Sequence, residues 1–212
     1  MKLFWSTSSP FARKARVVLR EKNLLAAVQE IECNPFADPV ELRAVNPLGK
    51  IPTLVLPSGE ALYDSPVICA YLDSLNSSPG LIPEGPAQWN VRRAEALADG
   101  LLDLAVGLTL ELRRPKTEQS PTTIERWRRA GVAAAGEMEL TLSSLPADVT
   151  LGHVAFACAC GYLDFRPASV EFRWRDTLPR LAQWYETFAL RASMIDTRPD
   201  DGSYQRFAPP AQ

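Results

Sequence analysis

The apolar residues of this 212-residue chain follow two different patterns, and the change falls near residue 77. Before that point, short runs of branched and aromatic residues alternate with stretches of helical periodicity, which predicts strands and helices in turn. We expect strands at residues 2–5, 27–32, 51–56 and 61–63, and helices at 10–22, 39–45 and 66–76. The first two strands are joined through a helix and should be parallel, whereas the last two should form a hairpin. These elements predict a small α/β layer structure over residues 1–76.

Residues 77–86 contain three prolines and two glycines and predict a linker between two domains. No strand signal follows, so the second domain, residues 87–212, should be entirely helical. Its expected helices are 87–113, 122–144, 150–165 and 178–190. The third of these is almost continuously apolar and should be the buried central helix. From Arg198 on, proline and aspartate are frequent, and we expect a loose tail.

Composition and charge exclude several classes of protein. Apolar residues make up 46% and charged residues 23% of the chain, which is typical of a globular domain rather than a disordered one. The net charge of −2 provides no field that would draw the chain to nucleic acid or to an anionic membrane. No apolar run is long enough to cross a bilayer, and the N-terminus lacks the layout of a signal peptide. We therefore expect a cytoplasmic protein with no nucleic-acid or membrane partner.

The four cysteines show neither the density of a disulfide framework nor the spacing of zinc ligands. They are Cys33, Cys69, Cys158 and Cys160. Cys158 and Cys160 are two positions apart in a helical stretch and should point in different directions. We interpret all four as small apolar core residues, and no metal site is expected.

Ser9 and Pro10 form a strong helix-start signal, because serine suits the N-cap and proline the first helical position. The helix that follows should lay one apolar face on the sheet. Its cations, expected off that face, are Arg13, Lys14, Arg16 and Arg20. Free backbone N–H groups and the positive end of the helix dipole meet at its start and would suit an anion. For an isolated Ser-Pro pair, simple helix capping is the alternative.

Two further segments are expected to meet this helix start. Pro52 opens a strand that otherwise has an interior pattern, and proline cannot join the ladder there. A cis Ile51-Pro52 bond is one way to place it and would free the backbone of Ile51 for a peptide-like ligand; the alternative is a proline that begins an edge strand. Asp64 and Ser65 mark another helix start, able to hold a carboxylate by hydroxyl and backbone N–H. Asp64 could also face an amine.

In combination, these segments resemble a cytosolic glutathione S-transferase. Four stretches carry the resemblance, which covers nearly the whole chain: Ser9-Pro10-Phe11-Ala12-Arg13-Lys14, Asn46-Pro47-Leu48-Gly49-Lys50-Ile51-Pro52, Asp64-Ser65 and Gly161-Tyr162-Leu163-Asp164-Phe165. The chain is most similar to small bacterial members with serine rather than tyrosine at the active site. The resemblance implies a thioredoxin-like α/β N-terminal domain followed by an all-α C-terminal domain.

The resemblance also implies that glutathione lies along the first domain as a co-substrate. Ser9 would serve the thiol, Ile51 the cysteinyl backbone and Lys50 the glycyl carboxylate, while the γ-glutamyl end would meet Asp64 and Ser65. The implied glutathione-binding residues are Ser9, Phe11, Lys50, Ile51, Pro52, Asp64 and Ser65. Ser8 remains open as the thiol partner, because in some serine-type members the working hydroxyl stands two residues before the proline.

The reaction implied is conjugation of reduced glutathione to a small hydrophobic electrophile by a homodimeric detoxification enzyme. Leu104, Leu108 and Trp127 are candidates for the electrophile pocket of the second domain. An excess of apolar residues on the helices 66–76 and 87–113 also favours a homodimer. The alternatives are a thiol–disulfide or deglutathionylating enzyme and a non-catalytic binding module.

Ser9 can stabilise a thiolate without a general base. A free thiol has a pKa near 8.5, and lowering it by about two units requires roughly 2.7 kcal/mol of preference for the anion. A hydrogen bond to a charged group contributes about 1.5–3 kcal/mol, and a helix N-terminus about 0.3–2 kcal/mol.

The remaining polar candidates are interpreted as structural. His153 stands where the resembled family has the aspartate of a Ser/Thr-x-x-Asp capping box, and we expect it to cap its helix. Asp99 and Asp103 lie on one helix face and should be solvated; the alternative is a role near the glutathione amine or the pocket floor. Four tryptophans are expected in core or domain packing: Trp89, Trp127, Trp174 and Trp184.

Overall fold

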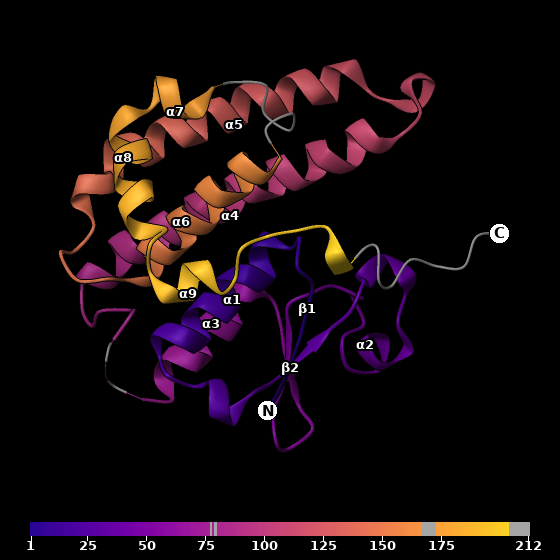
Figure 1. Cartoon of the computed structure of the whole chain (residues 1–212), viewed down its shortest axis with the longest axis vertical. Coiled ribbons are helices and arrows are strands. Elements are labelled where there is room, and N and C mark those ends of the chain that lie inside the picture. Colours follow the sequence, from indigo (N-terminus) through magenta and orange to yellow (C-terminus); the bar gives the residue numbers. More distant parts are fainter. Residues whose placement is uncertain (77, 79, 167–172, 204–212) are drawn as a thin grey trace. The chain divides into compact units, whose positions relative to one another are not determined.

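The computed structural model of the chain describes residues 1–76, 78, 80–166 and 173–203. It divides into two compact units, Met1–Leu81 with Ala192–Gln212, and Ile82–Arg191. Figure 1 shows strands in the first unit and helices alone in the second. The described residues from Ala192 to Ser203 group with the first unit rather than with the helices before them.

A four-stranded mixed sheet forms the centre of the first unit. Its strands are β1 (Lys2–Trp5), β2 (Gln29–Glu32), β3 (Thr53–Val55) and β4 (Ala61–Leu62), in the order β2-β1-β3-β4. β1 and β2 are parallel, and β3 is antiparallel to both β1 and β4, as the connections predict. The second strand begins two residues later than expected, because the 3-10 helix η1 (Leu25–Ala27) takes the start of the predicted segment.

Helices of the first unit cover the sheet and hold its core. They are α1 (Pro10–Glu21), the 3-10 helix η2 (Pro35–Ala37), α2 (Val40–Val45), α3 (Ser65–Ser74) and α9 (Ala192–Ile195). α1 and α3 pack against each other, and α9 packs on α1 (Figure 1). Phe4, Cys33 and Leu42 form a buried cluster between the sheet and α2, against which the half-buried Ile51 packs.

Three of the four cations on α1 are buried, which the sequence pattern did not indicate. They are Arg13, Lys14 and Arg16, and the C-terminal segment, which packs on α1 through α9, supplies the partners of Arg13. Arg13 donates hydrogen bonds to the Met194 carbonyl at 3.1 Å and to the Thr197 hydroxyl at 3.4 Å. Buried cations require such partners, since desolvation of an unpaired charge costs several kcal/mol.

Two carboxylates, Glu30 and Asp73, hold α1 to its neighbours through ion pairs. Glu30 on β2 binds both Arg16 and Arg20 of α1, and the Arg16 guanidinium lies over the Trp5 ring at 3.4 Å from its centroid. At the end of α1, the fully buried Lys22 ammonium contacts the Asp73 carboxylate at 2.8 Å. Both contacts tie α1 to its neighbours with charge-assisted hydrogen bonds, which are stronger than neutral ones.

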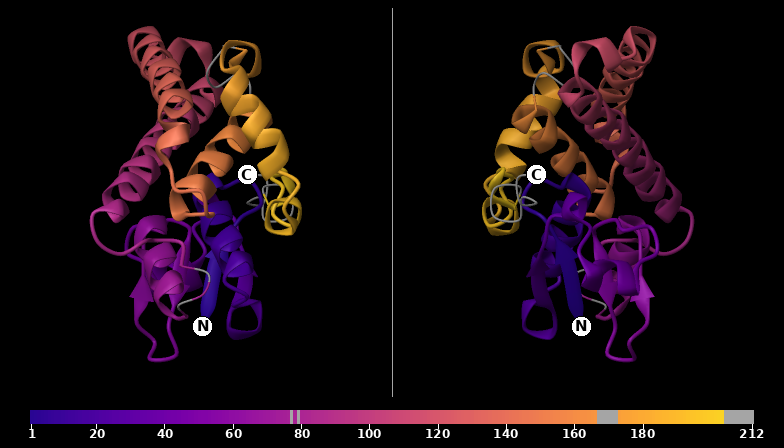
Figure 2. Two further views of the ribbon diagram at one scale, coloured as in Figure 1. Left: turned by 90° about the vertical axis from the view of Figure 1, so that its left-hand side faces the viewer. Right: turned by 90° about the vertical axis from the view of Figure 1, so that its right-hand side faces the viewer.

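The second unit is helical throughout its described part, as predicted. Its helices are α4 (Ala87–Arg113), η3 (Lys116–Glu118), α5 (Pro121–Thr141), η4 (Leu142–Ser144), α6 (Leu151–Phe165), α7 (Trp174–Thr177) and α8 (Pro179–Phe188). α6 is buried from Leu151 to Leu163 and packs against α4, which confirms its central position (Figure 2). None of the helices described here is long and apolar enough to cross a membrane.

His153 completes a capping box at the start of α6, as predicted. Its Nδ1 accepts a hydrogen bond from the Thr150 amide at 3.1 Å, and Thr150 in turn caps the helix. The imidazole stacks on Phe188, with ring centroids 6.5 Å apart. Burial disfavours the charged imidazolium and lowers the pKa of His153.

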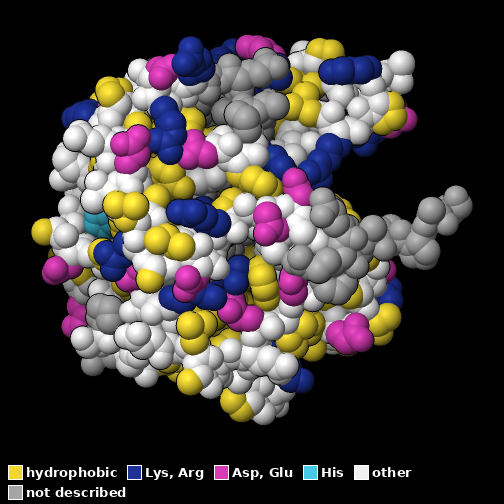
Figure 3. Space-filling view, in the orientation of Figure 1, with side chains coloured by type: hydrophobic (Ala, Val, Ile, Leu, Met, Phe, Trp, Pro, Cys, Tyr) yellow, Lys and Arg dark blue, Asp and Glu magenta, His cyan; other side chains and the backbone are white. Residues whose placement is uncertain are grey.

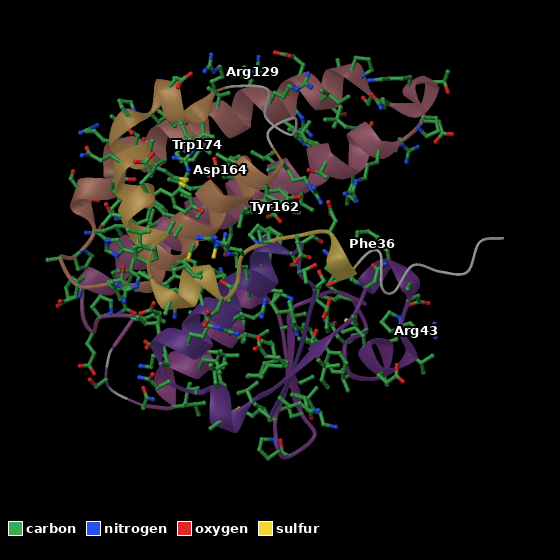
Figure 4. All side chains as sticks on the ribbon, in the orientation of Figure 1. Phe36, Arg43, Arg129, Tyr162, Asp164 and Trp174 are labelled. Carbon is green, nitrogen blue, oxygen red and sulfur yellow. The ribbon has the colours of Figure 1, made fainter. Side chains whose placement is uncertain are left out.

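The tryptophans differ in their environment. Trp174 is buried and its indole N–H donates to Asp164 at 3.0 Å; Figure 4 labels both. Trp127 packs over Gly107, where an added Cβ would lie 3.0 Å from the indole. Trp89 has 68% of its surface exposed, so its predicted packing role is wrong for the isolated chain.

Candidate functional site

Strand register brings the three predicted site segments to the same end of the sheet. Phe4 of β1 pairs with Thr53 of β3, and Leu54 of β3 pairs with Leu62 of β4. Both pairs are antiparallel, so the end of β1, the start of β3 and the end of β4 lie at the same end of the sheet. The same end therefore holds the loop after β1, the loop before β3 and the residues after β4. The segments that hold Ser9, Pro52 and Asp64 therefore border one region of the first unit.

Ser9 is the N-cap of α1. Its backbone is extended, its hydroxyl accepts a hydrogen bond from the Ala12 amide at 3.2 Å, and Pro10 takes the first helical position. Among the described residues this hydroxyl has no acceptor for its own proton, which leaves the proton available to an incoming anion. Phe11 follows in the first turn and is half-buried.

Ser8 lies one residue earlier, in the turn between β1 and α1, and is half-buried. Its hydroxyl makes no hydrogen bond to any residue the structure describes. Ser8 is therefore not built into the helix cap, whereas Ser9 is. Both hydroxyls remain within the loop that faces the site end of the sheet.

The Ile51-Pro52 peptide is cis, one of the two arrangements that the sequence left open. Pro52 is buried and Ile51 packs its side chain into the Phe4 cluster, so β3 starts only at Thr53. No main-chain hydrogen bond of Ile51 occurs within the described residues, which leaves its N–H and C=O for a ligand. Lys50, directly before it, is exposed.

Asn46 organises this loop from inside. Its buried side chain donates to the Lys50 carbonyl at 3.0 Å and to the Thr53 hydroxyl at 2.8 Å, and accepts from the Leu48 amide at 2.9 Å. Gly49 adopts the left-handed conformation, with a φ of 60°, that the turn requires. From the sequence, Asn46 was noted only as part of the stretch that carries the family resemblance. The tendency of asparagine to bond the backbone two residues on is the signal that would have predicted its role in this loop.

Asp64 and Ser65 begin α3. Asp64 is the N-cap residue, but its side chain makes no capping hydrogen bond and the residue is exposed. Ser65 is almost fully buried in the first turn. The Tyr63-Asp64 peptide is also cis, a feature for which the sequence carried no signal. The helix start offers backbone N–H groups to an anion, and Asp64 adds a carboxylate beside them.

No cysteine of the chain has the environment of a nucleophile. All four are buried, as predicted. Cys33 follows β2 at the same end of the sheet, but burial and the neighbouring Glu32 carboxylate raise the pKa of its thiol to about 11. The pKa of the fully buried Cys160 is also raised, chiefly by burial. The residues described also include no cluster of three or more histidine, cysteine or carboxylate side chains that could hold a metal ion.

Comparison with known families assigns both parts of the chain. Residues 8–75 match the glutathione S-transferase N-terminal domain, and residues 121–187 match the glutathione S-transferase C-terminal domain. The chain belongs to the glutathione S-transferase family. Along nearly its whole length this family member is 36% identical to the uncharacterized GST-like protein YibF of Escherichia coli, over 94% of this chain and 98% of that protein.

Solved structures agree with this assignment. A glutathione S-transferase of Methylobacillus flagellatus with glutathione bound is 39% identical, with a TM-score of 0.87, over 94% of this chain and 99% of that one. A glutathione transferase family member of Pseudomonas fluorescens with bound glutathione is 37% identical, with a TM-score of 0.88, over 94% of this chain and 98% of that one. The glutathione S-transferase fold predicted from the sequence, a mixed-sheet domain followed by a helical one, is thus confirmed.

Proposed function

We propose that the protein is a glutathione transferase that conjugates reduced glutathione to a small hydrophobic electrophile. The observation that carries the proposal is the Ser9 hydroxyl at the N-terminus of α1, which accepts from the Ala12 amide and keeps its own proton for an anion. The similar glutathione S-transferases of Methylobacillus flagellatus and Pseudomonas fluorescens hold glutathione in their structures.

In the proposed reaction, Ser9 donates a hydrogen bond to the sulfur of glutathione and favours the thiolate over the thiol. The dipole of α1 favours the same negative charge. The thiolate attacks the electrophilic carbon, the carbon–sulfur bond forms, and the leaving group departs with the electron pair of the bond that breaks. The thiol proton passes to water before the attack, and Ser9 stays protonated throughout, so the protein supplies no general base.

Three further contacts would hold the rest of the tripeptide. The backbone of Ile51 would pair with the cysteinyl residue, next to the buried Pro52. Lys50 is exposed and long enough to meet the glycyl carboxylate. The γ-glutamyl end, which carries an amine and a carboxylate, suits the Asp64 side chain and the helix start at Ser65. Phe11, half-buried in the first turn of α1, would contact the ligand from the Ser9 side.

The electrophile class and the assembly are part of the same proposal. Leu104 and Trp127 are half-buried in the helical unit and remain candidates for an apolar pocket, whereas Leu108 is fully buried and is withdrawn. Asp103 is exposed, as expected of a solvated face, and Asp99 is half-buried. The mixture of acidic and basic side chains on the face in Figure 3 supports a small-molecule substrate rather than nucleic acid, and a cytoplasmic detoxification role fits this chemistry.

A homodimer is supported by apolar side chains left open on two helices. Val67 on α3, Leu75 directly after α3 and Trp89 on α4 are exposed in the isolated chain. Such side chains are typical of an interface between copies. Light scattering of the pure protein should therefore give about twice the 23.4 kDa of one chain. A mass near 23.4 kDa would contradict the dimer.

Turnover with an aromatic halide tests the activity. We expect wild type to form the thioether, Ser9→Ala to lose about 10- to 100-fold in kcat with glutathione affinity within about threefold, and Ser8→Ala to stay near wild type. If Ser8→Ala loses kcat instead, then Ser8 rather than Ser9 is the residue that stabilises the thiolate. Calorimetry of glutathione binding distinguishes the transferase from the non-catalytic alternative. If the protein binds glutathione but shows no turnover, it is a binding module rather than a transferase.

A further inference from the structure

The described end of the chain runs back along α1 to the loop that precedes Ser9. Met194 and Thr197 are bonded to Arg13, and the Ser193 hydroxyl donates to Glu21 at the far end of the helix. The segment then continues to Ser203, which is fully buried. The prediction of a loose tail from Arg198 is therefore wrong up to Ser203, and the rest of that tail, residues 204–212, lies outside the described residues.

Ser203 and Thr7 form a closed set of hydrogen bonds. The Thr7 amide donates to the Ser203 hydroxyl at 2.8 Å, and the Ser203 amide donates to the Thr7 hydroxyl at 3.1 Å. The Thr7 hydroxyl donates onward to the Asp200 carbonyl at 3.0 Å. The Ser203 hydroxyl gives its proton to the Glu32 carboxylate at 2.6 Å, which is a charge-assisted bond.

This set joins the ends of two neighbouring strands. Trp5 and Glu32 are paired residues at the ends of β1 and β2, and Thr7 lies just beyond Trp5. Ser203 thus ties the loop after β1 to the last residue of β2. Within the described chain, all side-chain hydrogen bonds that join residues 6–8 to distant parts of the sequence run to residues 200–203.

Thr7 stands two residues before Ser9, and the loop between them is short. The Ser9 amide turns back to the Ser6 carbonyl at 3.4 Å, so the position of Thr7 constrains where α1 begins. A hydroxyl that stabilises a thiolate must lie within hydrogen-bond reach of the sulfur, and a misplacement of about 1 Å can cost up to two orders of magnitude in rate.

We propose that Ser203 is a positioning residue for Ser9, acting through Thr7. The inference rests on the proposed transferase function. Ser203 does not touch glutathione in this account; it fixes the loop so that the Ser9 hydroxyl meets the sulfur. Residues 200–203 then help to position the site, whereas the earlier part of the C-terminal segment only covers α1.

The test compares five full-length variants, one of them the double variant Ser203→Ala with Thr7→Val, with wild type in turnover with an aromatic halide over a range of pH. Ser203→Ala removes the hydroxyl that bonds Thr7 and Glu32, and Ser203→Thr keeps a hydroxyl at this position. Thr7→Val removes the hydroxyl on the other side of the same set of hydrogen bonds, with little change in side-chain shape. Ser193→Ala is the matched control, because it also removes a buried serine that donates to a glutamate from the same segment, but at the far end of α1.

We expect Ser203→Ala and Thr7→Val each to lower kcat about tenfold, with KM for glutathione within about twofold and the pH profile moved to higher pH. The double variant should lose little more than either single one, since both break the same set of contacts. Ser203→Thr should recover most of the rate, and Ser193→Ala should keep the rate and pH profile of wild type. Amide hydrogen exchange at residues 6–9 should speed up in Ser203→Ala and not in Ser193→Ala.

Three outcomes would overturn the inference. If wild type turns over and Ser203→Ala matches it, the positioning role fails and the proposed function stands. If Ser193→Ala loses as much rate as Ser203→Ala, the C-terminal segment affects the rate through its general packing on α1, and Ser203 has no specific positioning role. If wild type forms no conjugate, the proposed function fails and the positioning role fails with it.

Discussion

The Asn46 side chain donates to the Thr53 hydroxyl at 2.8 Å, across the turn that carries Lys50, Ile51 and Pro52. The same amide donates to the Lys50 carbonyl, and the Thr53 hydroxyl donates to that carbonyl as well, at 2.8 Å. Three polar groups thus bond one another, and two of them, the side chains of Asn46 and Thr53, are fully buried. The backbone proposed to pair with glutathione is held by this network rather than by the sheet.

Asn46→Ala should therefore lower the free energy of unfolding by about 2–4 kcal/mol, because it removes three hydrogen bonds and leaves buried partners unsatisfied. Asn46→Asp, which keeps the acceptor but loses both donor bonds, should be almost as damaging. Urea unfolding of the pure variants measures both. Ser58→Ala, which touches an exposed turn, is the control and should stay within about 0.5 kcal/mol of wild type. An equally small effect of Asn46→Ala would contradict the account.

His153 should make the stability depend on pH. Its pKa is lower in the folded protein than the ordinary value of 6.5, so the unfolded chain takes up the proton first as the pH falls. The contribution of the neutral ring is complete above about pH 6.5 and is lost as the pH drops below it, by at most about 1.4 kcal/mol per pH unit. Urea unfolding at about pH 7.5 and pH 5 should reveal this loss.

His153→Gln provides the matched comparison for that series. Glutamine at this position can still accept from the Thr150 amide but does not titrate. Its unfolding free energy should fall less than that of wild type between the two pH values. If the unfolding free energies of wild type and His153→Gln fall equally between the two pH values, the pH dependence comes from groups other than His153.

Cys33 should take no part in the reaction. With a pKa of about 11, only about one thiol in ten thousand is ionised at neutral pH. Cys33→Ala should keep kcat for conjugation within about twofold of wild type, and a thiol reagent should label native Cys33 far more slowly than unfolded chain. Reduction of a mixed disulfide that disappears in Cys33→Ala would instead support the deglutathionylating alternative.

The sequence was sufficient to predict the elements that hold the site because their signals are local. Ser9 with Pro10 and Asp64 with Ser65 are cap positions read within a few residues, and both helices start there. The Thr150–His153 cap was equally local, although a histidine stands in for an acid. The antiparallel pairing of β3 with both β1 and β4 then brings the segments together.

What the sequence did not predict depends on distant parts of the chain. The sequence did not indicate that Arg13 would be buried, because its partner Met194 is distant in the chain and no local pattern links the two residues. Ser203 and Thr7 are 196 positions apart, so no periodic pattern in the sequence could indicate their contact. Trp89 was expected in a core because aromatic residues usually are, yet the isolated chain leaves it exposed.

The most direct test of the central claim is the pKa of the glutathione thiol when it is bound to the protein. Thiolate absorbance in the ultraviolet, followed over pH with wild type and Ser9→Ala saturated with glutathione, measures it. We predict a bound pKa about two units below the free value near 8.5 in wild type, and a rise of about one to two units in Ser9→Ala. The same low pKa in Ser9→Ala as in wild type would contradict the role of the Ser9 hydroxyl.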